Sequence, residues 1–516
     1  MNALLWSTLL VPSAWAAASL ARASTPIIAQ NRTLSVPSSA PLGRQIIDAA
    51  FQSYSIELSS MVDFAGNLSH PNTLSHRLLQ NLFSLSGAHP LIRAGGTTAN
   101  RAIWVQNQTA AIIATFSPSS PDQPSALTIG PKFMESFHTF PSGTKYIFGL
   151  NFGDGDAGLD QTVLEAAGPV GSLGDSLYAF EIGNEVDGWP GGSRRPANWT
   201  VQAYVTQFLQ YATAIDSSVP NHSLYQAGAF EAPRALSNPN HTLWNAESIL
   251  YDGIARTGMV KTIAEHDYMG SACAGAAPVT LQKNLLDHSH MTSLMWYHDY
   301  LSNYSVAHGV PYVLGETNSI SCQGAPLISN VFASALWSID YVLYVSTLHI
   351  SRLYFHQGTN YRYSAWQPIT TPTADAGVRP LYYGNLFIAT ALAGGEKQVA
   401  VLINETAFTA YGIYDAGDAD GRLSALAVVN LRMWNSTQET GERPYTAVEV
   451  KVPGGKLGNA TVRRLTAPGV EIAGNVTWAG RSVDAEGFLT GTEVVEKIGD
   501  GNTVLVGAGE AVLITL

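Results

Sequence analysis

Two glutamates lie where the side chains of a parallel barrel would meet. Glu185 ends the predicted strand 177–185 and Glu316 ends the predicted strand 311–316, so the two are 131 residues apart. A single glutamate at a strand end is more often an ion-pair partner or a solvated group. Two facing carboxyl groups suit glycoside hydrolysis, in which one protonates the leaving oxygen and the other attacks or stabilises the anomeric carbon. The pair therefore indicates a candidate glycosidase site.

The elements that must position this pair recur along most of the chain. Apolar strand-like runs alternate with segments of helical periodicity over residues 45–394, a pattern that is typical of a parallel sheet. Eight such runs are the number that closes a (β/α)8 TIM barrel. They are residues 53–58, 91–95, 145–151, 177–185, 223–230, 261–268, 311–316 and 351–356. The alternative is a doubly wound open sheet, which usually has a G-x-G-x-x-G loop after its first strand. Here the first run continues as Glu57-Leu58-Ser59-Ser60, which favours the barrel.

The pattern of apolar residues changes after residue 394. Short alternating runs at 423–431, 445–452, 460–465 and 503–516 are broken by Gly, Pro, Asn and Asp. This pattern predicts antiparallel strands, and we expect residues 395–516 to form an appended β-sandwich domain. Residues 24–44 have a similar character, so we expect them to add a strand to the same domain.

The N-terminus and the sequons indicate export from the cell. Residues 3–20 carry no charge, and A-x-A patterns follow at 14–16 and 21–23, which predicts a signal peptide over residues 1–23. An N-terminal membrane anchor is the alternative. N-x-S/T sequons point to a secreted, extracellular glycoprotein. They lie at Asn31, Asn67, Asn107, Asn198, Asn221, Asn240, Asn303, Asn404, Asn435, Asn459 and Asn475.

Composition narrows the range of partners. The 516 residues include 27 Lys plus Arg against 39 Asp plus Glu, a formal net charge of -12. This acidic balance argues against nucleic acid and anionic membrane surfaces as partners. One more apolar run, 331–350, is interrupted by Asp340 at its middle, which favours a buried helix over a membrane span. We expect a monomer.

At the level of motifs, the sequence resembles glycoside hydrolase family 79, the family of β-glucuronidases and heparanases, within the clan A barrel glycosidases. The stretches that carry the resemblance occur in the family's order, and the C-terminal region resembles its appended β-domain. They are 92–97 (IRAGGT), 148–151 (FGLN), 180–187 (FEIGNEVD), 266–268 (HDY), 315–326 (GETNSISCQGAP) and 355–361 (FHQGTNY). The resemblance implies a retaining, cofactor-free mechanism. Glu185 would be the general acid/base and Glu316 the nucleophile, with carboxyl groups about 5 to 5.5 Å apart.

The resemblance also implies roles for residues around the pair. Asn184 should hydrogen-bond the sugar 2-OH, and Tyr268 is placed to hydrogen-bond Glu316. Glu57 should contact sugar hydroxyls, with an ion pair at the barrel floor as the alternative. The substrate carboxylate should be bound by backbone amides of the loop after the nucleophile and by a tyrosine after the eighth strand, which match Cys322, Gln323, Gly324 and Tyr361 here. Heparanases carry Gly-Gly where this chain has Cys322-Gln323, so the shape of that loop is open.

The two cysteines, Cys273 and Cys322, follow the sixth and seventh predicted strands. In an oxidising compartment we predict that they form a disulfide that holds the carboxylate-binding loop. Two cysteines provide no zinc cluster, and we expect no metal and no cofactor. Glu181 has the strand parity of Glu185 but lies deeper, and we interpret it as a partner of Arg93.

These observations predict a secreted, retaining exo-β-glucuronidase that removes terminal glucuronic acid, or its 4-O-methyl ether, from oligo- or polysaccharides. An endo-acting enzyme of the heparanase or hyaluronan type is the first alternative. Such enzymes need an open cleft and, for heparan sulfate, basic rims, which the acidic balance disfavours. A carbohydrate-binding protein without turnover is the second alternative, and the matched pair of glutamates argues against it.

Overall fold

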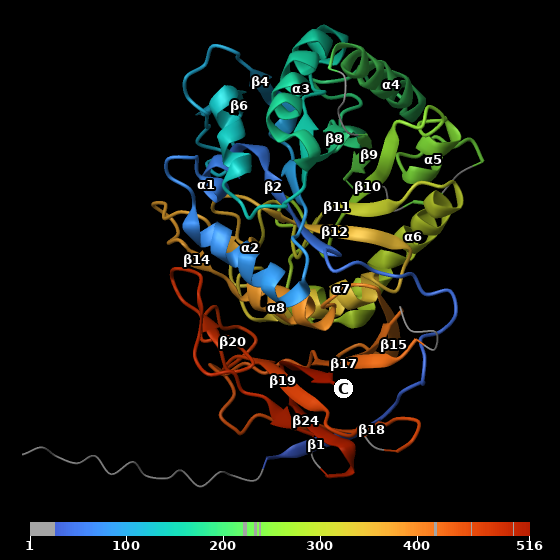
Figure 1. The fold of residues 1–516 in the computed structure, drawn as a ribbon, viewed down its shortest axis with the longest axis vertical. Coiled ribbons are helices and arrows are strands. Elements are labelled where there is room, and N and C mark those ends of the chain that lie inside the picture. Colours follow the sequence, from blue (N-terminus) through green and yellow to red (C-terminus); the bar gives the residue numbers. More distant parts are fainter. Residues whose placement is uncertain are drawn as a thin grey trace, which may run out of the picture.

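The computed structural model describes residues 26–219, 224–231, 235–236, 239–416, 421–455, 457–498 and 500–516. The predicted signal peptide and the sequon at Asn221 lie outside the described residues. In the described part the chain forms a barrel above a β-rich domain (Figure 1).

Eight parallel strands close into a barrel, as predicted. Each strand hydrogen-bonds to the next in chain order, and the last pairs with the first. Most of their residues are buried, because helices cover the outside of the barrel and side chains fill its interior. The strands are β2 (Gln52–Glu57), β3 (Ile92–Gly95), β7 (Tyr146–Leu150), β8 (Leu177–Ile182), β9 (Tyr225–Phe230), β10 (Val260–Tyr268), β11 (Tyr312–Asn318) and β12 (Ile350–Gln357).

The helices that surround the barrel begin at recognisable caps. Asn72, Thr200, Asn245 and Asp287 each accept a hydrogen bond from a backbone N–H of the first helical turn, which satisfies a donor that the helix itself leaves free. The helices are α1 (Met61–Ala65), α2 (Thr73–Ser86), α3 (Leu159–Leu173), α4 (Val201–Ser218), α5 (Ala246–Tyr251), α6 (His288–Ala307), α7 (Ala333–Val345) and α8 (Pro380–Ala391).

Helix α7 occupies the apolar run that contains Asp340, and almost all of its residues are buried. This confirms the prediction of a buried helix. Among the described residues, no helix has the length and apolar character needed to cross a membrane.

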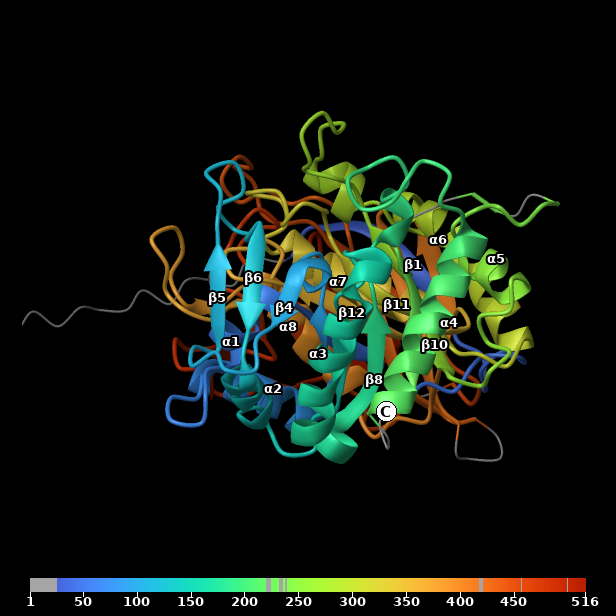
Figure 2. The same ribbon diagram turned by 90° about the horizontal axis from the view of Figure 1, so that it is seen from above.

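A small sheet is inserted between β3 and β7. It consists of β4 (Ala102–Trp104), β5 (Ile112–Thr115) and β6 (Ala126–Ile129), in the order β4-β6-β5. Strands β5 and β6 form an antiparallel hairpin, which stands beside the barrel (Figure 2). This insertion was not predicted from the sequence, because its strands are only three or four residues long.

The C-terminal domain is a β-sandwich, as predicted. One sheet contains β15 (Lys397–Glu405), β16 (Phe408–Asp415), β17 (Leu423–Asn430), β25 (Glu510–Thr515), β19 (Thr461–Thr466), β20 (Thr477–Trp478) and β23 (Glu496–Lys497). The other contains β1 (Ile28–Ser35), β18 (Tyr445–Lys451) and β24 (Thr503–Gly507), with β1 parallel to β18. Side chains of both sheets share one core, which includes Leu34, Val428, Val448 and Val506. The opposite face of the larger sheet packs on α7 and α8.

Short two-stranded pairs complete the described secondary structure. They are β13 (Trp366–Gln367) with β14 (Gly377–Val378), and β21 (Ser482–Val483) with β22 (Leu489–Thr490).

Candidate active site

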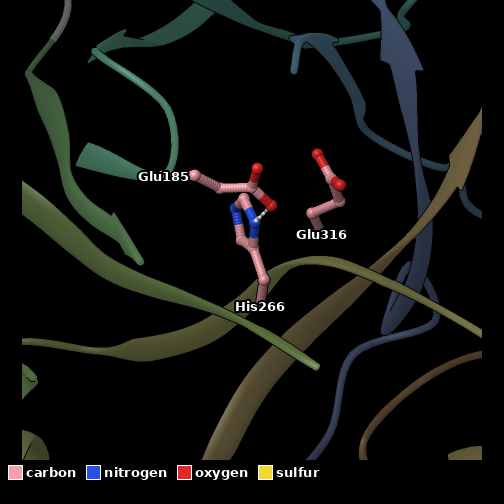
Figure 3. A group of neighbouring side chains, drawn as sticks. All are labelled: Glu185, His266 and Glu316. Carbon is pink, nitrogen blue, oxygen red and sulfur yellow. Dashed lines mark hydrogen bonds and ion pairs between the residues drawn. The ribbon is translucent and has the colours of Figure 1, made fainter. Parts of the chain in front are cut away.

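Glu185 and Glu316 meet at the carboxyl-terminal ends of the barrel strands (Figure 3). One carboxylate oxygen of each and a ring nitrogen of His266 all lie within 4.8 Å of one another. Glu316 is part of β11, whereas β8 ends at Ile182, three residues before Glu185. The strand ends early because Gly183 and Glu185 adopt left-handed backbone conformations, with φ of 82° and 52°. This turn directs Glu185 toward the centre of the barrel mouth.

Glu316 is held as a carboxylate by a cation and a phenol. Arg93 Nη1 donates to Glu316 Oε2 at 2.7 Å, and the Tyr268 hydroxyl donates to Glu316 Oε1 at 2.7 Å. Burial alone would raise the pKa of Glu316, but the positive charges of His356 and Arg93 and the Tyr268 hydrogen bond outweigh burial and lower the pKa well below its usual range. Glu316 is therefore ionised in mild acid.

Glu185 has the opposite electrostatic setting. Its pKa is raised well above the usual range, first by burial and then by the negative charges of Glu316 and Glu231. A hydrogen bond of 3.1 Å joins its Oε1 to Nδ1 of His266. Burial lowers the pKa of His266 to about 4, so this histidine is neutral in mild acid and leaves the proton on Glu185.

Arg93 organises the floor of the site. It is fully buried, and besides Glu316 it donates to Glu181 Oε1 and to Asn184 Oδ1, both at 2.5 Å from Nη2. This agrees with the interpretation of Glu181 as a partner of Arg93. Because Asn184 Oδ1 is occupied by Arg93, its amide nitrogen Nδ2 points away; this buried atom has no hydrogen-bond partner among the described residues. Asn184 therefore presents a free donor close to both glutamates.

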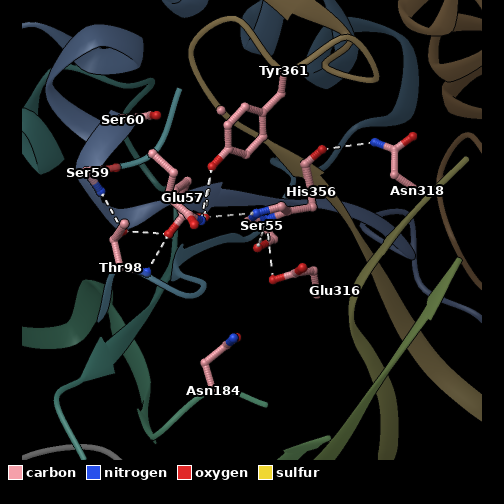
Figure 4. Close-up of polar contacts among 12 residues, drawn as sticks. Ser55, Glu57, Ser59, Ser60, Thr98, Asn184, Glu316, Asn318, His356 and Tyr361 are labelled. Atoms are coloured by element: carbon pink, nitrogen blue, oxygen red, sulfur yellow. Dashed lines mark hydrogen bonds and ion pairs between the residues drawn. The ribbon is translucent and has the colours of Figure 1, made fainter. Parts of the chain in front are cut away.

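Glu57 lies at the end of β2, across the imidazole of His356 from Glu316 (Figure 4). His356 Nε2 is 3.5 Å from Glu57 Oε2, and His356 Nδ1 is 3.5 Å from Glu316 Oε2. The two carboxylates raise the pKa of His356 although burial opposes them. Glu57 also accepts from the N–H of Thr98 at 2.8 Å and from the Tyr361 hydroxyl at 3.2 Å. Glu57 thus has an ion-pair partner, but the pair lies at the carboxyl-terminal end of β2 and not at the barrel floor.

The loop after β11 has the features of an anion site. Cys322, Gln323 and Gly324 have φ of 57°, 63° and 82°, and successive left-handed residues can turn several N–H groups toward one anion. Among the described residues, none accepts a hydrogen bond from these three N–H groups. Cys273 and Cys322 form a disulfide, with 5.3 Å between their Cα atoms, which ties this loop to the one that follows β10.

Arg362 fastens the same loop from the other side. Its backbone N–H donates to Gln323 O at 2.7 Å, and its Nε donates to Gly324 O at 2.8 Å. Tyr361, which precedes it, is buried, and its hydroxyl bonds to Glu57. The residues predicted to bind the substrate carboxylate therefore lie near each other. The guanidinium of Arg362 contacts a carbonyl of the loop that carries the backbone amides.

Several residues of this arrangement were not predicted. His266 shares its strand face with Tyr268, two residues on, so strand parity could have found it. Arg362 could have been suspected from its place beside Tyr361. Asn100 holds the backbone of Asn184 in both directions, accepting from its N–H at 2.9 Å and donating to its carbonyl at 2.8 Å. No local pattern marks Asn100, because its partner is 84 residues away.

A cavity of about 460 Å³ opens beside the pair. Glu185, Tyr268 and Ser321 form one wall, whereas Glu316 does not line it. The remaining wall comes largely from the loop after β10 and from two acidic residues near Glu185. The lining includes Asp187, Glu231, Gly270, Cys273, Ala276, Ala277, Pro278, Val279, Lys283, Asn284 and His290.

Glu185, His266 and Glu316 are also the group of described residues whose donor atoms are close enough to share a metal ion. Both oxygens of Glu316 already accept hydrogen bonds from Arg93 and Tyr268. One carboxyl group that stays protonated beside one that stays ionised is the arrangement that acid-catalysed displacement requires, so proton transfer and nucleophilic attack account for all three groups.

Known proteins resemble the chain over most of its length. Residues 410–513 match the glycosyl hydrolase family 79 C-terminal β domain. A β-glucuronidase of Aspergillus niger is 36% identical over 89% of this chain and 87% of its own, and a β-glucuronidase of Neurospora crassa is 32% identical over 90% of each.

Solved structures also resemble the chain over most of its length. A 4-O-α-L-rhamnosyl-β-D-glucuronidase of Fusarium oxysporum superimposes with a TM-score of 0.78 at 27% identity, covering 94% of this chain and 100% of its own. A family 51 arabinofuranosidase of Xanthomonas axonopodis shares the fold, with a TM-score of 0.60 at 15% identity over 94% of this chain and 99% of its own. The identity of more than 30% over nearly the whole length decides the classification. The chain belongs to glycoside hydrolase family 79 and is a glycoside hydrolase.

Proposed function

We propose that this protein is a secreted, retaining exo-β-glucuronidase that removes terminal glucuronic acid, including its 4-O-methyl ether, from glycans. The observation that carries the proposal is the pair Glu185 and Glu316, with carboxylate oxygens within 4.8 Å and pKa values displaced in opposite directions. Retaining enzymes need carboxyl groups about 5 to 5.5 Å apart, whereas inverting ones leave room for a water between groups about 6.5 to 9.5 Å apart. The β-glucuronidase relatives support the glycone.

In the first step, Glu316 attacks the anomeric carbon while protonated Glu185 gives its proton to the glycosidic oxygen. The bond to the leaving group breaks, and a glycosyl ester forms on Glu316. This ester has no negative charge, so the pKa of Glu185 falls and its carboxylate can act as a base. In the second step Glu185 takes a proton from water, the water oxygen bonds to the anomeric carbon, and Glu316 leaves as a carboxylate.

The sugar is held by groups on both sides of the pair. The free amide donor of Asn184 lies where it can bond the 2-OH, and such a contact strengthens in the transition state. The N–H groups of Cys322, Gln323 and Gly324 supply donors for the C6 carboxylate. Since Glu185 faces the leaving group, the cavity of about 460 Å³ beside it is the place for the aglycone.

Exo action is favoured over the endo alternative because Glu57, which does not line this cavity, is buried under contacts with Gln123 and Tyr361. Export is supported by the sequons: the ten that the structure describes have exposed or partly exposed asparagines. The closely placed carboxyl groups of Glu185 and Glu316 argue against a binding protein without turnover.

The proposal is tested with purified protein and nitrophenyl β-glucuronide, β-glucoside, β-xyloside and β-galactoside at mildly acidic pH. We expect turnover of the glucuronide alone, and none for Glu316→Ala. Proton NMR of the first product should show the β anomer before mutarotation. Release of the α anomer would overturn the retaining mechanism, and cleavage inside a glucuronate polymer without hydrolysis of the nitrophenyl glycoside would establish endo action.

A further inference from the structure

We propose that the loop between β5 and β6 forms the end wall of the sugar pocket, and that Gln123 on this loop limits the size of a substituent on the 4-oxygen of the glucuronate. The inference rests on the proposed function. It assigns to this enzyme glucuronates that are free or methylated at O4, and excludes those that carry a further sugar there.

The direction of the bound sugar follows from the distances in the site. The anomeric carbon must lie at Glu316, and the imidazole of His356 spans the space from Glu316 to Glu57, with 3.5 Å at each end. A pyranose that reaches over this imidazole brings C4 toward Glu57, because C4 is opposite C1 in the ring. The group on O4 then points past Glu57.

Gln123 occupies the space beyond Glu57. Its Nε2 donates to Glu57 Oε2 at 3.1 Å and to the Tyr361 hydroxyl at 3.4 Å. The side chain therefore links Glu57, at the end of β2, to Tyr361 on the loop that follows β12. Among the described residues, no other side chain of the inserted sheet or its loop has a hydrogen bond to Glu57.

The loop that carries Gln123 is fastened at several points. Asp122 forms an ion pair with Arg362 at 3.1 Å and accepts from Asn360 Nδ2 at 3.4 Å. On the other side of Gln123, the carbonyl of Pro124 accepts from Arg101 Nη1 at 3.1 Å. The wall thus has fixed anchors on both flanks, and it joins the inserted hairpin to the loop after β12.

This wall discriminates between small and large substituents on the 4-oxygen. A methyl ether adds one carbon, which the rotation of a single amide side chain can accommodate. A glycosyl group needs the volume of a whole ring, so Gln123 must lose both contacts and Asp122 must release Arg362. The Fusarium enzyme is named for a 4-O-rhamnosyl glucuronide, and we expect this chain to differ from it at this wall.

The test compares kcat/KM for three substrates: nitrophenyl β-glucuronide, its 4-O-methyl ether and its 4-O-α-L-rhamnosyl derivative. For the wild-type enzyme we expect the methyl ether to be within about 10-fold of the free glucuronide and the rhamnosyl compound to be at least about 100-fold poorer. Gln123→Ala removes the bulk and Asp122→Ala unfastens the loop, and each should reduce the 100-fold difference by at least about 10-fold.

Ser119→Ala is the matched control, since this exposed residue of the same loop contacts Ser117 and should leave the substrate ratio unchanged. Equal turnover of the free and rhamnosyl compounds by the wild type, or an unchanged ratio in both wall variants, would refute the role of the wall while the proposed function stands. Absence of turnover of all three substrates would instead refute the proposed function.

Discussion

At the residue scale, two identical side chains acquire opposite properties from their surroundings. Glu185 and Glu316 are both carboxyl groups in one site, yet only Glu316 has Arg93 and Tyr268 as hydrogen-bond donors. Glu185 has a neutral histidine and nearby acids instead. Since an uncompensated charge in a buried site is costly, Glu185 keeps its proton and Glu316 loses it.

Replacing the acid tests this division of roles. Glu185→Ala should lower kcat by about 10²- to 10⁴-fold for glycosides with poor leaving groups, because general acid catalysis contributes that much. A dinitrophenyl glucuronide, whose leaving group needs no proton, should lose far less in its first step. Added azide should restore turnover and yield a β-glucuronyl azide. An equal loss for all leaving groups would contradict the acid role.

The pH profile reports the environment of the acid. Glu231 raises the pKa of Glu185 through its negative charge, and activity is lost when pH rises through that pKa. Glu231→Gln removes the charge, so it should move the alkaline limb of kcat/KM to lower pH and leave the acid limb in place. Glu439→Gln, at an exposed position of the β-domain, serves as the control. A shift toward higher pH would show that the sign is wrong.

At the scale of elements, loops after different strands lock one another into position. The loop after β3 supplies Asn100, which bonds both the N–H and the carbonyl of Asn184. The loop after β10 is tied to the loop after β11 by the disulfide. Rigid strands deliver these loops to one face of the barrel, and side-chain contacts then fix their conformations.

The two hydrogen bonds of Asn100 to the backbone of Asn184 position the neighbouring acid, Glu185, so we expect Asn100 to affect kcat. Asn100→Ala frees the turn that carries Asn184 and Glu185, so kcat should fall by about 10- to 100-fold, since displacements of about 1 Å cost this much. The melting temperature is measured in parallel. A lower melting temperature with unchanged kcat at low temperature would show that Asn100 has only a structural role.

The disulfide should support binding of the substrate carboxylate. In the double variant Cys273→Ser and Cys322→Ser, we expect a severalfold higher KM for the glucuronide, a kcat near the wild-type value, and a loss of about 2 to 4 kcal/mol in stability. The Tyr268 and Arg93 contacts to Glu316 do not depend on this bond, which is why kcat should persist. Loss of kcat without a change in KM would contradict this assignment.

At the scale of the whole molecule, the barrel and the β-domain share a core. One continuous apolar cluster includes Trp337 of α7 and Leu386 of α8 together with Tyr411 and Leu513 of the larger sheet. A polar contact crosses the same interface, since the Tyr411 hydroxyl donates to Asp340 Oδ1 at 2.6 Å and His288 Nδ1 is 2.9 Å from Asp340 Oδ2. We therefore expect the two domains to unfold together.

This interface is tested by Tyr411→Phe. The change leaves a buried oxygen of Asp340 without its donor, which should lower the free energy of unfolding by about 1 to 3 kcal/mol. Denaturant unfolding followed by fluorescence and by far-UV circular dichroism should give one coincident transition. Tyr445→Phe in β18 is the control and should cost less than about 0.5 kcal/mol. Two separate transitions would show that the domains are independent.

The sequence by itself was sufficient to predict the barrel, the sandwich and the two glutamates. Strand and helix periodicities depend on neighbouring residues, and together with the geometry of parallel sheets they place Glu185 and Glu316 near strand ends. The exact ends differ from the prediction, because β8 stops at Ile182 and β11 continues to Asn318. The burial of the helix that contains Asp340 was also predictable from the sequence. A charged residue in the middle of an apolar run favours a buried helix over a membrane span.

The contact of Tyr268 with Glu316 was already implied by the family resemblance. Only the tertiary structure showed that Arg93, His266 and His356 also contact this pair. Arg93 contacts Glu316, 223 residues further along the chain, and Gln123 reaches Tyr361 across 238 residues. Asn100 and the short hairpin that carries Gln123 have no periodicity of their own. These contacts exist because closure of the barrel brings the ends of distant strands together, and such proximity is a property of the closed sheet and not of any local stretch of sequence.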